Sequence, residues 1–165
     1  MEFKNRITRD KALCGKNVLV DTIHFKGPVD VTDPGYDRDV WCRINDLQVE
    51  EGDYDCIAVL ADEGLCGICV KRIGIYLDGK IPRRRAMKYV GNIGVDAGLA
   101  GFFMNKPDFT DEEWIRFCDE MISDGCAWTI DDGFFSESGY GDGSYDLYGH
   151  YNENGVLDAL ELVFI

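Results

Sequence analysis

The stretch from Phe134 to Ile165 constrains the fold of this chain most strongly, because its turn residues alternate with aromatic and aliphatic runs. Gly141-Asp142-Gly143 predicts one chain reversal and Asn152-Glu153-Asn154-Gly155 predicts a second, since tight hairpin turns favour residues that accept positive φ. The tyrosines and leucines around these turns favour extended backbone. The stretch is therefore predicted to form three β-strands folded back twice.

Further runs upstream also favour strands bounded by glycine, proline and acidic turns. The expected strands are 17–23, 29–31, 55–61, 65–77 and 127–130, with a strand, a tight connection and a second strand in 89–104. Between the second and third runs, Pro34 and Gly35 predict a type II turn, because Pro presets φ at its second position and Gly accepts positive φ at its third. The Asp33 side chain is expected to accept backbone N–H groups across that turn.

One amphipathic helix is expected over about 111–123. Thr110 and Glu113 have the spacing of a capping box, and Phe109 can pack against Trp114 as a staple. The helix carries one apolar face, and Gly125 is placed to end it in a left-handed conformation. Few helical and many strand signals together predict an α+β, mainly β fold. It is an antiparallel sheet or two-sheet sandwich with this helix packed on it.

Length and charge limit the domain organisation and the partners. The 165 residues suit one globular β-rich domain over 17–165, preceded by a mobile or weakly attached segment over 1–16. Lysines and arginines number 17 against 31 aspartates and glutamates, giving a net charge of −14. That charge argues against nucleic acid as a partner, because phosphates attract clustered basic residues. It fits solubility alone, or a basic protein partner.

The sequence also indicates a compartment. The charged first residues contain no apolar segment typical of a secretory signal, and no apolar run approaches the roughly 20 residues needed to span a membrane. The seven cysteines form an odd set, which favours reduced thiols. A cytoplasmic protein without membrane contact is therefore expected.

Motifs for cofactor chemistry and nucleophilic catalysis are missing from the sequence. No phosphate-binding loop or dinucleotide fingerprint occurs, and no serine lies in a nucleophile-elbow motif. Cys66 and Cys69 have C-x-x-C spacing but lie in an expected strand, where their side chains point to opposite faces. The basic island 80–88 suits either a phosphate-binding site or, as the favoured interpretation, a solvated loop. No cofactor is expected.

Three motifs in order resemble a broad family of uncharacterised bacterial and phage-associated β-rich domains. They are Asp33-Pro34-Gly35-Tyr36, the run Gly94-Val95-Asp96-Ala97-Gly98-Leu99-Ala100-Gly101, and the run Ser138-Gly139-Tyr140-Gly141-Asp142-Gly143-Ser144-Tyr145. The matching positions are Asp33, Tyr36, Asp96, Gly98, Asp142 and Tyr145. The resemblance spans roughly 17–165 and implies a compact β-rich domain with no activity that can be transferred. Gly35 departs from the family, in which many members carry a cysteine there.

The candidate site residues leave structural, binding and metal interpretations open. Asp96 and Asp142 lie beside glycines, where aspartate commonly bonds its own backbone, and they are also weak candidates for a Ca²⁺ or Mg²⁺ site. Asp96 is expected to be buried, because the run around it is largely apolar. Tyr140 and Tyr145 belong to an aromatic cluster that suits sheet packing or a protein-binding surface.

The function predicted from these residues is that of a small acidic, non-catalytic binding protein. A toxin-neutralising or phage-defence accessory role is a hypothesis within that class, since an acidic surface suits a basic nuclease partner. The alternatives are a metal-dependent, hydrolase-like enzyme that uses Asp96 and Asp142, and a purely structural subunit. The positions predicted to bind a ligand or partner are Asp33, Tyr36, Asp96, Gly98, Tyr140, Asp142 and Tyr145.

Overall fold

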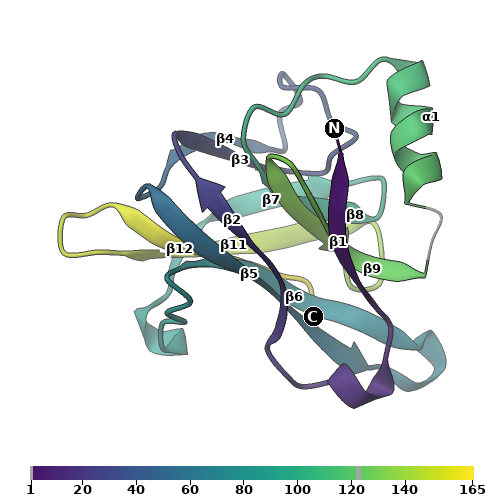
Figure 1. Ribbon diagram of the computed structural model, residues 1–165, viewed down its shortest axis with the longest axis horizontal. Helices are drawn as coiled ribbons and strands as arrows, with labels where there is room; N and C mark the ends of the chain where they lie inside the picture. Colours follow the sequence, from purple (N-terminus) through teal and green to yellow (C-terminus); the bar gives the residue numbers. More distant parts are fainter. Residues whose placement is uncertain (1, 122–123) are drawn as a thin grey trace.

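A computed structural model describes residues 2–121 and 124–165 of the chain, and in this part twelve strands form two six-stranded antiparallel sheets (Figure 1). The first sheet has the order β1 (Phe3–Thr8), β9 (Gly125–Ile130), β10 (Gly133–Glu137), β8 (Leu99–Phe103), β3 (Pro28–Thr32), β4 (Ile44–Gln48). The second has the order β2 (Val18–Phe25), β5 (Gly52–Asp62), β6 (Ile68–Leu77), β12 (Leu157–Val163), β11 (Gly143–Tyr151), β7 (Lys88–Val95). Three short 3₁₀ helices complete the connections: η1 (Lys11–Leu13), η2 (Gly64–Cys66) and η3 (Arg84–Ala86). The predicted α+β, mainly β class is confirmed as a two-sheet sandwich.

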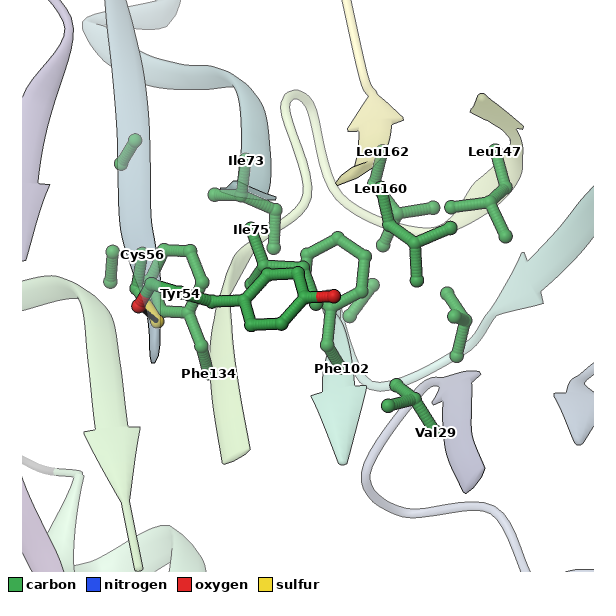
Figure 2. Packing of buried hydrophobic residues seen from close by; sticks show 14 of the residues in the cluster. Val29, Tyr54, Cys56, Ile73, Ile75, Phe102, Phe134, Leu147, Leu160 and Leu162 are labelled. Atoms are coloured by element: carbon green, nitrogen blue, oxygen red, sulfur yellow. Dashed lines mark hydrogen bonds between the residues drawn. The ribbon is translucent and has the colours of Figure 1, made fainter. Parts of the chain in front are cut away.

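The main core lies between the two sheets. Figure 2 shows Phe102 and Phe134 of the first sheet near Ile73 and Leu160 of the second, and all four side chains are buried. The rings of Phe102 and Phe134 stack with their centroids 6.4 Å apart. Each large side chain buried here contributes about 1.5–3 kcal/mol relative to an exposed position, so this layer supplies much of the driving force for folding.

The helix α1 (Asp111–Glu120) covers the outer face of the first sheet with a second, largely aromatic core. Phe117 is its buried residue and packs against Phe135 of β10 with ring centroids 5.3 Å apart. The predicted capping box is confirmed: Glu113 N–H donates to Thr110 Oγ1 at 3.2 Å, and Thr110 N–H donates to Glu113 Oε1 at 3.1 Å. Because both faces of the sheet are covered here, β8 and β9 are buried along their whole length.

The end of the helix differs from the prediction. The helix ends at Glu120 with Met121 as its C-cap, and residues 122 and 123 of the predicted range lie outside the described residues. Gly125 does not have a positive φ and begins β9, so its predicted role as a left-handed cap is wrong. A Cβ on Gly125 would lie 2.5 Å from Trp128 Nε1, which shows that glycine is needed there for close indole packing.

The C-terminal stretch forms three strands as predicted, but they do not fold back twice within one sheet. β11 and β12 form the predicted hairpin, in which Asn152 N–H donates to Val156 O at 2.8 Å and Gly155 has a φ of +75°. β10 instead belongs to the other sheet, between β8 and β9. The segment 138–142 therefore carries the chain from one sheet to the other, as the segment 96–98 does between β7 and β8.

The start of the chain also differs from the expectation of a weakly attached segment over 1–16. Residues 3–8 form β1, which pairs antiparallel with β9 and contributes an edge of the first sheet (Figure 1). Phe3 packs into the aromatic core beside Phe117, with ring centroids 5.2 Å apart. The charged sequence of this segment reflects its exposed edge position, because only its partly buried residues face the protein.

Candidate functional site

Asp33 links the first two sequence motifs. Its side chain is fully buried, and its Oδ1 accepts the N–H of Gly35 at 2.7 Å. Its Oδ2 accepts the N–H groups of Asp96 at 2.8 Å and Ala97 at 2.7 Å, more than sixty residues further along the chain. Burial raises the pKa of the Asp33 carboxyl, while the three N–H donors favour the carboxylate and oppose that shift. Asp33 thereby fastens the loop between β3 and β4 to the connection between β7 and β8.

The turn that starts at Asp33 confirms one prediction and corrects another. Asp33 accepts a local backbone N–H as expected, and Tyr36 N–H also donates to Asp33 O at 3.1 Å. Gly35 does not have a positive φ, so the type II turn is wrong, because that turn requires one at its third position. The backbone at Gly35 instead has a φ that most residue types can adopt. The hydrogen bond from Gly35 N–H to the Asp33 side chain stabilises this turn.

Tyr36 is held through its backbone and its ring. Its carbonyl oxygen accepts hydrogen bonds from Arg43 Nη1 at 2.8 Å and Lys106 Nζ at 3.1 Å. Burial, followed by a hydrogen bond with Cys42, raises the pKa of the Tyr36 hydroxyl to about 12. The side chain is therefore a neutral phenol at physiological pH, placed beside Cys42 at the outer edge of β7.

We expect Lys106 to give the protein a measurable dependence on alkaline pH. Burial, and then the charge of Arg43, lowers its pKa from 10.5 to about 8. Between pH 8 and pH 10.5, the unfolded chain therefore binds more protons at Lys106 than the folded chain does. The contribution of Lys106 to the free energy of unfolding thus rises as pH increases through this range. Relative to Lys106→Met, the unfolding free energy should gain about 2 kcal/mol over that window, which is less than the full shift implies because solvent screens this partly exposed group.

Denaturant unfolding of both chains at pH 7, 8, 9 and 10 checks this prediction. The comparison between the two chains removes the contributions of tyrosines and cysteines, which also titrate at alkaline pH. A difference in unfolding free energy that stays constant from pH 7 to pH 10 would contradict it.

The second and third motifs meet where the two connections between the sheets run side by side. Ser138 N–H donates to Gly98 O at 3.0 Å, and Gly141 N–H donates to Ser138 O at 2.7 Å. Tyr145 OH donates to Gly141 O at 2.5 Å, with Ser138 O 3.1 Å away. Tyr145 therefore anchors the loop 138–142, and with Asp33 it brings all three motifs into one region.

Asp96 and Asp142 lie at matching ends of paired strands. Val95 of β7 pairs with Gly143 of β11, so the next residues outward are the two aspartates. Asp142 Oδ1 lies 3.8 Å from the position that a Cβ on Gly98 would occupy. Asp96 is exposed, which corrects the expectation of a buried carboxylate: its backbone N–H is held by Asp33 while its side chain is left at the surface.

The metal interpretation of this pair stays a prediction. Among the described residues, no group of three or more histidine, cysteine, aspartate or glutamate side chains is placed to hold a metal ion. Ca²⁺ takes six to eight oxygen ligands in proteins, so Asp96 and Asp142 would need further donors from a ligand or from water.

A cavity of about 470 Å³ lies beside the meeting point of the motifs, between α1, the end of β9 and the loop 138–141. Its lining residues are Arg9, Ala97, Gly98, Leu99, Trp114, Cys118, Met121, Gly125, Trp128, Glu137, Ser138, Gly139, Tyr140 and Gly141. The α1 side chains Trp114, Cys118 and Met121 form one wall, and Leu99 and Trp128 come from the sheet below. The apolar face of the helix thus does not close fully onto the sheet, and the hollow that remains has a mixed polar and apolar lining.

Trp128 carries an unusual polar atom in this wall. Its indole Nε1 is the one buried side-chain nitrogen or oxygen without a hydrogen-bond partner among residues 2–121 and 124–165. The ring stacks on Phe135 with centroids 5.3 Å apart, and its nitrogen lies against Gly125. A buried donor without a partner costs about 1–3 kcal/mol, which the close packing of the indole against Phe135 and Gly125 must offset.

The mouth of the cavity carries an ion pair and an exposed tyrosine. Arg9 Nη2 contacts Glu137 Oε2 across the opening. Tyr140 is exposed on the loop 138–141, and desolvation followed by a hydrogen bond with Glu63 raises the pKa of its hydroxyl. Leu65, two residues after Glu63, is fully exposed in η2.

Acidic residues are frequent in the segments that line this opening. Besides Glu137, four exposed aspartates directly adjoin lining residues in the chain; these are Asp96, Asp119, Asp124 and Asp142. We refer to Glu137 and these four aspartates as the acidic rim. Of the residues that the structure describes, Arg9 is the only basic one that lines the cavity. The site therefore combines a hollow of mixed polar and apolar lining with acidic residues in the neighbouring chain segments.

The structure brings most of the predicted site residues together, but in different roles. Asp33 and Tyr145 form hydrogen bonds to backbone groups of the connecting loops, whereas Gly98 and Tyr140 line the cavity. The sequence did not identify the residues that complete it, notably Arg9 and Trp128. Arg9 lies in the segment 1–16, which was expected to be weakly attached, and Trp128 belongs to none of the three motifs.

Two other sequence features lie outside this site. In the basic island, Arg84 Nη1 forms an ion pair with the buried Glu161 at 2.8 Å, and Tyr76 OH also donates to Glu161 at 2.6 Å. Arg84 thus has a structural partner, and phosphate binding by the island stays a prediction. Cys66 is exposed and Cys69 is buried, and both thiols are free.

Comparison of the chain with protein-family models, with curated proteins and with solved structures finds no match. The motif resemblance to bacterial and phage-associated domains therefore stays a prediction. In the part of the chain that the structure describes, no helix is long and apolar enough to cross a membrane.

Proposed function

We propose that the protein is a small cytoplasmic, non-catalytic binding protein that holds a basic protein partner at the mouth of the cavity. The observation that carries the proposal is the set of acidic residues in and next to the segments that line the cavity, together with the exposed side chains of Tyr140 and Leu65. Interface energy concentrates in a few aromatic or aliphatic anchors, while surrounding charges speed encounter and select the partner. The net charge of −14 adds a long-range attraction for a basic protein.

A toxin-neutralising or phage-defence accessory role is the biological setting that we propose for this activity. A nuclease that acts on nucleic acid carries basic residues for the phosphates, and an acidic protein can occupy that surface. The motif resemblance to bacterial and phage-associated domains supports the same setting.

Charge reversal at the rim tests the proposal. Asp142→Lys changes the rim, whereas Glu153→Lys makes the same change of charge in the β11–β12 turn, at the other end of β11. Figure 1 shows this turn far from α1, which walls the cavity. We expect Asp142→Lys to reduce capture of a stoichiometric basic partner from source-cell lysate roughly fivefold, corresponding to about 1 kcal/mol, and Glu153→Lys to leave it nearly unchanged.

Quantitative mass spectrometry of proteins captured by the tagged chain provides the measurement, at low and at raised salt. A specific partner should be released as salt increases, because rim charges are screened over about 10 Å at 0.1 M ionic strength. Equal capture of the same proteins by both variants would contradict the proposal, as would a captured set without basic proteins.

A further inference from the structure

A second, smaller pocket adjoins the large cavity, and its lining is acidic and aromatic. Its volume is about 260 Å³, and it is lined by Asp33, Gly35, Tyr36, Asp96, Ala97 and Trp114. We call it the small pocket. Ala97 and Trp114 also line the large cavity, so the small pocket lies beside the place where the proposed function puts the partner. Its volume is below the roughly 300–1,000 Å³ of sites that enclose a small-molecule ligand, and it suits a single side chain.

Two carboxylates give the small pocket its charge. Asp33 is fully buried and both of its oxygens accept backbone N–H groups, so it contributes negative charge more than a free acceptor. Asp96 is exposed, so its carboxylate can pair with a cation that stays partly in water. Burial raises the pKa of the Asp33 carboxyl and the charge of Asp96 raises it further, which means that the two groups repel each other. A bound cation would relieve this repulsion.

The aromatic part of the lining is packed closely against the same turn. A Cβ on Gly35 would lie 3.2 Å from both Asp33 Oδ1 and the indole ring of Trp114, so glycine allows the indole to approach the carboxylate. Trp114 also stacks on Phe117, with ring centroids 5.6 Å apart, which fixes the position of the indole. Tyr36 supplies the second aromatic residue of the lining.

The basic residues that contact this turn do not line the small pocket. Arg43 and Lys106 both donate to the carbonyl oxygen of Tyr36, and Arg43 also pairs with the buried Asp30 at 3.0 Å. Among the described residues, no group of three metal-ligating side chains is present, so two carboxylates alone suit a metal ion poorly. Carboxylates beside aromatic rings suit an organic cation, because the rings attract it through their quadrupoles.

We propose that the small pocket receives one cationic side chain of the partner, from lysine or arginine, which contacts the Trp114 indole and pairs with the Asp96 carboxylate. This inference rests on the proposed function and names one contact that a basic partner makes. A basic partner is then recognised at a defined position as well as through the net charge of the protein.

Three peptides with blocked ends separate recognition of the cation from apolar contact. Each has four glycines around one central residue, which is lysine, arginine or norleucine; norleucine has a straight apolar chain without the ammonium group. Titration into ¹⁵N-labelled protein at low salt, followed by NMR, should show at least one cationic peptide binding about fivefold or more tightly than the norleucine peptide. The signals that shift should include the backbone N–H groups of Gly35, Asp96 and Ala97 and the indole N–H of Trp114.

Paired variants locate the binding site. Asp96→Asn removes the exposed carboxylate, and Glu153→Gln removes the same charge in the β11–β12 turn. Trp114→Leu removes the indole, and Trp41→Leu removes a tryptophan that is 91% exposed and does not line the small pocket. We expect Asp96→Asn and Trp114→Leu each to weaken binding of the cationic peptide about threefold, and the two controls to leave it nearly unchanged. Circular dichroism checks that each chain folds, and the peptide comparison on the unaltered chain decides the inference even where Trp114→Leu does not fold.

The outcomes distinguish this inference from the proposed function. Equal affinity for the cationic and norleucine peptides would overturn the inference, as would equal weakening by Asp96→Asn and Glu153→Gln. Signals that shift only at other acidic residues would overturn the small pocket as the site while leaving a surface that attracts basic groups. Failure of all three peptides to bind would also overturn the inference, whereas the proposed function is decided separately by capture with Asp142→Lys, a residue outside the small pocket.

Discussion

Replacing Asp33 by alanine is expected to lower the free energy of unfolding by about 3 kcal/mol. The side chain is fully buried and accepts three backbone N–H groups, from Gly35, Asp96 and Ala97. Alanine would leave all three without their partner, and each unpaired donor costs up to about 3 kcal/mol where water cannot reach it. Gly35, Asp96 and Ala97 are exposed residues, so water offsets part of this loss.

Asp33→Asn provides a finer comparison. The amide keeps one acceptor oxygen but presents N–H donors at the other position, where the carboxylate accepted a hydrogen bond. Asp33→Asn should therefore lower the free energy of unfolding by about 1–2 kcal/mol, which is a smaller loss than that of Asp33→Ala. Urea unfolding followed by circular dichroism measures both effects, and Asp142→Ala, at an exposed aspartate in the same region, should change stability by less than about 0.5 kcal/mol.

The same carboxyl should also affect the acid limb of the stability curve. Burial raises its pKa above the ordinary value of 3.8, so the folded state holds the proton more tightly than the unfolded chain. The stability due to this protonation is present at low pH and is lost as pH rises from 3.8 through the raised pKa. Asp33→Asn should remove this part of the pH dependence.

An alanine variant as stable as the wild type would show that the three hydrogen bonds of Asp33 contribute little to stability.

Local patterns in the sequence predicted the fold class better than the site. The capping box at Thr110 and Glu113, and the turn at Asn152–Gly155, depend on neighbouring residues alone, and both are confirmed. The connection 138–142 has the same turn composition, yet it crosses between sheets, because β10 finds its partners in β8 and β9. Turn chemistry shows where a chain bends but does not show which strand it joins.

The candidate site depends on contacts between distant parts of the chain. The local hydrogen bond of Asp33 was predicted from turn chemistry, whereas its bonds to Asp96 and Ala97 depend on the order of the strands. Trp128 is an ordinary strand residue in the sequence, and it lines the cavity only because α1 lies across its end of the sheet. A periodic pattern identifies such residues as apolar, but it does not indicate where packing stays incomplete.

Gly101→Ala is expected to cause a loss of stability of about 3 kcal/mol by overpacking. Gly101 lies in the middle of β8, where a Cβ would overlap the carbonyl oxygen of Phe134 and the side chain of Phe135. One of these contacts is backbone of the paired strand β10, so relief requires the strands to separate and their aromatic side chains to move. The glycine-rich run in this region thus reflects close packing of β8 against β10 as well as the turn at Gly98.

Gly155→Ala serves as the control for this prediction. Gly155 has open space around it and a φ of +75°, so alanine there tests backbone conformation without overlap. It should cost about 1 kcal/mol, the usual penalty for a left-handed residue with a Cβ. Urea unfolding of both variants should show the larger loss for Gly101→Ala, because close-packed aromatic layers in both cores must yield to admit one methyl group. Equal losses would mean that β8 and β10 separate easily, and would argue against a rigid floor beneath the cavity.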